Sequence, residues 1–133
     1  MSIQDLHKEI KRRISINEIY DRDYREHLKK KEYVKVSEDL WGMVNNLASI
    51  LSLLLRGKPI SDHNDMRKFI DSISSLKSEP KLKELLLSCE RLHANFYHNF
   101  MDEIQLKEHI MKAEELIQLL KTYIWEKLQE LQI

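Results

Sequence analysis

The chain has 133 residues, of which 42% are hydrophobic and 33% charged, which suits one domain with one continuous core. Basic and acidic residues number 22 each, so the zero net charge excludes a general attraction to nucleic acid or to an acidic membrane. The single cysteine, Cys89, excludes an internal disulfide, and because no apolar signal segment or membrane-length run is present, we expect a soluble, cytoplasmic protein without a membrane partner.

Charge is unevenly spread along the chain. Residues 8–31 hold nine Lys or Arg against five Asp or Glu, whereas residues 102–133 hold four against seven. Two solvated helix faces that attract each other would give this pattern. The alternative is a basic patch around Arg12, Arg13 and Lys29–Lys31.

Helix-breaking residues are rare, with two glycines and two prolines in the whole chain. No strand-like alternation of useful length is present. The sequence therefore predicts an all-α fold, an up-and-down bundle of about five helices with a long C-terminal helix.

The N-terminal region carries two helix-start signals. Ser2 caps a first helix, which we assign to an N-terminal extension over residues 1–14. Ser15 and Glu18 form a capping box, so a second helix is expected to begin there and to run to about Lys30. Its inward positions are Ile16, Tyr20, Tyr24 and Leu28.

The next helix, residues 32–56, has the strongest apolar stripe, and Gly57 and Pro59 end it. Gly42 within it costs about 1 kcal/mol relative to Ala, which a close helix crossing would explain. We expect Trp41, beside the stripe, to be buried. The apolar positions are Val36, Leu40, Val44, Leu47, Leu51 and Leu54.

Three helices are expected after this point. A short one spans about residues 66–75, and another follows Pro80 with a buried stripe that includes Leu92, Phe96 and Phe100. Asp102 and Gln105 then cap the last helix, which is about 40 Å long at 1.5 Å per residue. Its heptad-like apolar spacing over such a length predicts a homodimer, with Trp125 either exposed or in a subunit contact.

Several chemistries lack their sequence signals. The chain has no glycine-rich phosphate loop and no HExxH motif, and His93 and His98 are five residues apart, on different faces of a helix. We therefore expect no metal and no cofactor. Spacing does not exclude a Ser-His-Asp arrangement, although nothing points to one.

One segment, residues 91–100, is dense in polar and aromatic groups. Arg91, Asn95 and His98 fall on one flank of the predicted helix, and His93 and Tyr97 share the opposite flank. Such residues are either hydrogen-bonded within the bundle or across an interface, or they form a functional site.

Two motifs carry a family resemblance. Leu92-His93-Ala94-Asn95-Phe96-Tyr97 resembles a signature of the archaeal PaREP family, and Ser37-Glu38-Asp39-Leu40-Trp41-Gly42 resembles its earlier signature. The helix end at Arg56-Gly57 matches as well, and the likeness covers about residues 17–120. That family is similar to HEPN domains, so the resemblance implies a HEPN-like core over residues 15–133.

HEPN-like proteins include RNA-cleaving toxins and partners of nucleotidyltransferases, which leaves two functional hypotheses. The first is a non-enzymatic module that homodimerises and binds a protein, nucleotide or nucleic-acid partner. The second is a metal-independent ribonuclease, because Arg91 and His98 match the Arg-x(4–6)-His pattern of active members. In it His98 is the general base, Arg91 stabilises the phosphorane, and Asn95 orients the phosphate or the imidazole.

Overall fold

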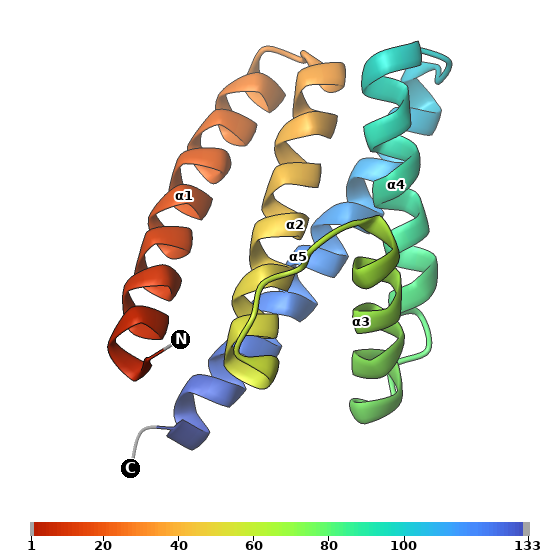
Figure 1. Cartoon of the computed structure of the whole chain (residues 1–133). Coiled ribbons are helices and arrows are strands. Elements are labelled where there is room, and N and C mark those ends of the chain that lie inside the picture. The colour runs from red at the N-terminus through yellow and green to blue at the C-terminus, as the bar shows by residue number, and fades with distance from the viewer. Residues whose placement is uncertain (1, 132–133) are drawn as a thin grey trace.

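A computed structural model describes residues 2–131 as five α-helices with no strand among them (Figure 1). This confirms the all-α bundle with a long last helix. Within the described range, no helix combines the length and apolar content needed to cross a membrane. The helices are α1 (Ile3–Lys29), α2 (Tyr33–Arg56), α3 (His63–Leu76), α4 (Leu82–His98) and α5 (Glu103–Leu131).

Helix α2 is the centre of the bundle and packs against α1, α4 and α5, while the short α3 lies mainly on α4. The four long helices alternate in direction (Figure 1). Helix α3 runs in the same direction as α2, because the loop after Gly57 climbs back along α2. The Ile60 amide donates to Ser49 Oγ at 3.1 Å, and α3 consequently begins beside Trp41.

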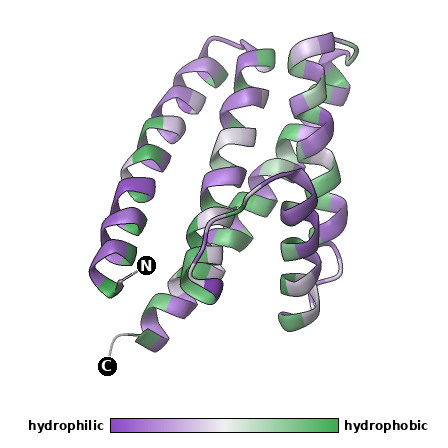
Figure 2. Ribbon diagram, in the orientation of Figure 1, coloured by the Kyte–Doolittle hydropathy of each residue, from purple (hydrophilic) through white to green (hydrophobic). Residues whose placement is uncertain are grey.

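Helix α1 is one continuous element, so the predicted helix boundary at Ser15 is wrong. Ser2 is the N-cap, and its hydroxyl accepts from the Asp5 amide at 3.0 Å, as expected. No Gly or Pro interrupts the following residues, and a break at Ser15 would leave a turn of backbone groups unpaired. Figure 2 shows α1 as mostly hydrophilic with isolated apolar positions. One apolar residue of this helix, Ile10, is buried.

Helix α2 follows its predicted course. It ends at Gly57, whose φ of 76° is the left-handed conformation that favours glycine. A Cβ added to Gly42 would lie 2.5 Å from the Tyr20 ring, which confirms the predicted close helix crossing and identifies α1 as the partner. Trp41 is 6% exposed and Trp125 is 61% exposed, so the expected contrast between the two indoles is confirmed.

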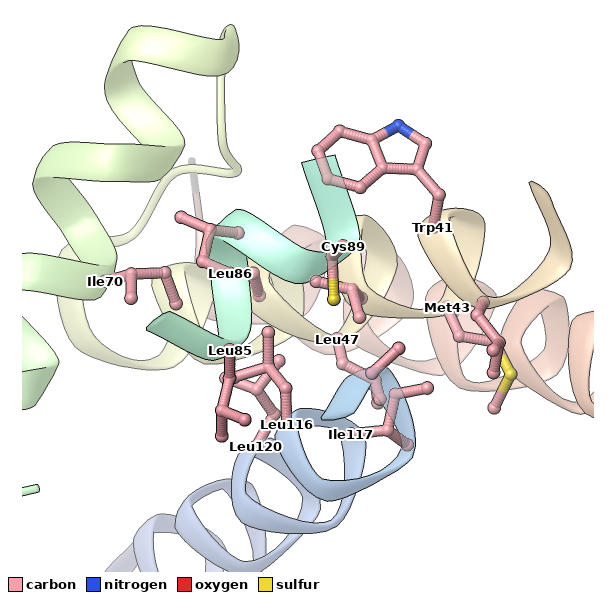
Figure 3. Packing of buried hydrophobic residues seen from close by; sticks show 14 of the residues in the cluster. Trp41, Met43, Leu47, Ile70, Leu85, Leu86, Cys89, Leu116, Ile117 and Leu120 are labelled. Atoms are coloured by element: carbon pink, nitrogen blue, oxygen red, sulfur yellow. The ribbon is translucent and has the colours of Figure 1, made fainter. Parts of the chain in front are cut away.

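The core forms where α2, α4 and α5 meet, with α3 closing one side. Figure 3 shows Leu47 near Leu116 and Ile117, and Trp41 at the edge of the cluster. Asp102 and Gln105 cap α5 reciprocally, each backbone amide donating to the other's side chain, at 3.1 and 2.8 Å. The 29 residues of α5 give a length of about 43 Å.

The buried stripe of α4 stops earlier than predicted. Leu92 is fully buried, but Phe96 is 38% exposed and Phe100 is 57% exposed, so their predicted burial is wrong. Helix α3 begins at His63, level with His93, and therefore leaves the next turn of α4 uncovered on that side. Asn95 occupies the buried position instead.

Candidate functional site

The two signature-like motifs contact each other at Trp41. The His93 ring of α4 stacks on the Trp41 indole of α2, with centroids 4.8 Å apart and planes 18° apart. His93 Nδ1 lies 3.1 Å from a carboxylate oxygen of Glu38, and Tyr97 meets the His93 ring edge-on at 5.3 Å. Two residues of α2 and two of α4, at least 52 positions apart in the chain, thus form one cluster of aromatic rings and a carboxylate.

His63, the first residue of α3, completes this cluster. Its ring centroid lies 5.4 Å from Trp41 and 5.9 Å from His93, and its side chain is exposed. The start of α3 is fixed by Asp62, which accepts from the Asp65 amide, and by a two-bond ion pair between Arg56 and Asp65. The Arg56 guanidinium holds the pKa of the Asp65 carboxyl well below its usual range.

Two clefts open on either side of Trp41 and Asn45, which line both. The first, of about 330 Å³, lies toward α1 and includes Arg12, Arg13 and Tyr20 in its walls. The second, of about 280 Å³, lies toward the loop before α3 and includes His63. The half-buried Asn45 therefore presents an amide between a basic cleft and an imidazole.

The two arginines of the first cleft are held in place by α1 and α2. Both guanidinium groups bond the Glu9 carboxylate, which lowers the Glu9 pKa, chiefly through Arg12. The Arg13 guanidinium also donates to the Asn46 side-chain oxygen at 3.4 Å, and the Asn46 side-chain amide donates to the Arg13 backbone carbonyl at 2.6 Å. The Arg12 side chain is more than half exposed, so it retains donors for an anionic group.

The structure sets Asn95 apart from Arg91 and His98, the other two residues assigned to ribonuclease chemistry. Arg91 and His98 are exposed, whereas Asn95 is fully buried, and its side-chain carbonyl accepts from the Met101 amide at 2.8 Å. Asn95 therefore secures the turn between α4 and α5. Partial burial lowers the pKa of His109 on α5, and the nearby charges of Lys112 and Arg91 lower it further. Arg91 therefore lies on the α5 side of α4.

The remaining motif residues have packing roles. The buried Ser37 hydroxyl donates to the Tyr33 carbonyl at 2.9 Å, Gly42 admits the Tyr20 ring, and Leu92 lies in the core. Phe96 contacts Tyr97 edge-on at 5.1 Å on the exposed end of α4. Across residues 2–131, no group of three or more His, Cys, Asp or Glu side chains is placed to hold a metal ion.

Sequence reasoning missed His63 and Asn45. Neither residue belongs to a recognisable motif, and His63 meets Trp41 only because the loop after Gly57 doubles back along α2. The sequence predicted this helix from about residue 66 and so placed His63 in the preceding loop, whereas the helix begins at His63.

Comparisons of this chain with protein-family models, with curated proteins and with solved structures found no match.

Proposed function

We propose that this chain is a non-enzymatic, HEPN-like helical module that homodimerises and binds a nucleotide, free or within single-stranded RNA, at the clefts around Trp41. The observation that carries the proposal is the convergence of aromatic rings, a free amide and ordered guanidinium groups on those two clefts. The HEPN-like and PaREP assignments are part of the proposal. They are supported by the direct contact of the two motifs through Glu38, Trp41 and His93.

Each part of a nucleotide has a matching group in this site. The exposed rings of His63 and Tyr97 offer surfaces for a base, since stacking on aromatic side chains tolerates any base. The Asn45 amide supplies both a donor and an acceptor for a base edge. Arg12 and Arg13 offer paired N–H donors suited to phosphate oxygens.

The test is a binding titration with nucleoside monophosphates and with a labelled oligouridine, monitored by calorimetry and by anisotropy. Arg12→Gln should weaken binding about tenfold, the usual scale for a hydrogen bond to a charged group. Arg22→Gln removes an exposed arginine from the same helix but not from the cleft, and should leave affinity unchanged. His63→Ala should weaken binding of the oligomer and of the monophosphate alike.

Failure of all these ligands to bind the wild-type chain would overturn the nucleotide proposal. Capture of a nucleotidyltransferase by the same surface, lost in His63→Ala, would instead favour a protein partner. Equal weakening by Arg12→Gln and Arg22→Gln would show that binding depends on overall charge rather than on the cleft.

A second candidate is a metal-independent ribonuclease, favoured by the exposure of both Arg91 and His98 on α4. His98 would take the proton from a ribose 2′-hydroxyl, and Arg91 would stabilise the charge on the phosphorane. The expected products are 2′,3′-cyclic phosphates, formed equally well in EDTA. Cleavage that persists in His98→Ala, or that requires a metal, would exclude this mechanism.

A further inference from the structure

Helices α1 and α5 lie on either side of α2 and leave a groove between them. One part, of about 220 Å³, has walls from both helices and a floor formed by Leu47 and Ile50 of α2. An adjoining part, of about 380 Å³, shares Ile14 and Leu128 with the first and continues to Leu6 and Leu131. Ten of the fifteen residues that line the two parts are apolar, so a mainly apolar face is presented to solvent.

Two features of the groove indicate what covers it. The Asn17 side chain on the α1 wall is only 8% exposed, and its carbonyl oxygen has no hydrogen-bond partner among residues 2–131. This carbonyl oxygen is covered by neighbouring atoms, so a donor from outside does not reach it and the wall beside it suits an apolar side chain. On the α5 wall, the Trp125 indole is 61% exposed and has one N–H donor on a large apolar body.

The charges at the mouth of the groove are of opposite sign. Glu18 lies on the α1 wall and Lys121 on the α5 wall. Helices α1 and α5 run antiparallel (Figure 1). A two-fold axis parallel to the helices would place α1 of each copy over α5 of the other. Glu18 of each copy would then face Lys121 of the other copy.

From this complementarity we infer that the occupant is a second copy of this chain, which inserts Trp125 into the groove. The inference rests on the homodimer of the proposed function and assigns its contact surface. The same contact covers Ile14, Leu128 and Leu131 in both copies, which removes the largest exposed part of the apolar face from water. The Trp41 clefts lie outside this groove and remain open.

The first experiment measures the dimer constant by sedimentation equilibrium. Trp125→Ala should weaken the dimer about 30-fold or more, as truncation of a buried interface Trp does. Trp125→Phe keeps a smaller aromatic ring, and should weaken the dimer less than Trp125→Ala does. Met111→Ala removes an equally exposed side chain from α5 outside the groove and should change nothing.

A charge exchange tests the two-fold arrangement. Glu18→Lys and Lys121→Glu each place like charges together at both sites of a homodimer, so each variant alone should be a monomer at micromolar concentrations. A mixture of the two has opposite charges at both sites and should form a heterodimer of wild-type affinity. Single variants that dimerise as well as the wild type, or a mixture that stays monomeric, would overturn the arrangement.

The outcomes separate this inference from the proposed function. A wild-type chain that is monomeric at high micromolar concentration would refute both the homodimer and the groove contact, while nucleotide binding is tested independently. A wild-type dimer that is insensitive to Trp125→Ala and to the charge exchange would keep the homodimer and refute the groove. A loss of dimer in Met111→Ala equal to that in Trp125→Ala would also refute it.

Discussion

Substitution of Gly42 tests the close contact of α2 with the Tyr20 ring of α1. A methyl group added at this position would lie 2.5 Å from Tyr20 Cε1 and 2.6 Å from Cζ, well inside contact distance. Gly42→Ala gains about 1 kcal/mol of helix propensity, and forcing the ring aside costs about 1–3 kcal/mol. The net effect should be a loss of about 0–2 kcal/mol in the free energy of unfolding.

The sign of the effect should reverse when the ring is absent. In a Tyr20→Ala background the methyl group meets no aromatic ring, so Gly42→Ala should stabilise the chain by about 1 kcal/mol. The difference between the two backgrounds is the coupling energy between residues 20 and 42, about 1–3 kcal/mol.

Urea unfolding followed by far-UV circular dichroism gives these values for the four proteins of the cycle. All four are measured at one protein concentration, because dimerisation raises apparent stability as concentration rises. If Gly42→Ala stabilises the wild type as much as it stabilises Tyr20→Ala, the helices do not approach closely there and the reasoning fails.

Three further predictions concern buried or half-buried polar groups on α4 and α5. Asn95→Ala leaves the buried Met101 amide without its acceptor and should lower the free energy of unfolding by about 1–3 kcal/mol in urea titrations; an unchanged midpoint would contradict this role. Partial burial lowers the pKa of His109 in the folded chain below the value near 6.5 that it has in the unfolded chain. The unfolded chain therefore binds more protons as the pH falls, and stability should decrease from pH 7 to pH 5. His109→Gln should make that fall shallower, and an identical pH profile would show that His109 does not contribute. Burial also raises the pKa of the Cys89 thiol, so it should react with a thiol reagent only on unfolding, and prompt labelling of the native protein would argue against this.

Local signals in the sequence were sufficient where the chain has no competing choice. Gly57 ends α2 in the left-handed conformation that glycine favours. The Asp102–Gln105 pair starts α5 because helix α4 has already ended at His98. The similar signal at Ser15 and Glu18 was misleading, since the backbone on both sides of it can continue the helix. A capping box therefore predicts a helix start only where something else ends the preceding helix.

The apolar spacing along each helix identified most of the core but not its limits. Phe96 continues the spacing of Leu92, yet it is exposed because α3 begins too late to cover it. Periodicity reports which side of a helix is apolar, whereas burial also requires a neighbouring element at that height.

The sequence by itself determined the all-helical fold, the need for a close crossing at Gly42 and the opposite environments of the two indoles. Only the tertiary structure brought His63 and Asn45 to Trp41, and only it left the α1–α5 groove open beside Asn17. These features join residues from different helices, and helix packing alone decides which of their faces meet. Local propensity acts over a few residues, so it carries no information about such contacts.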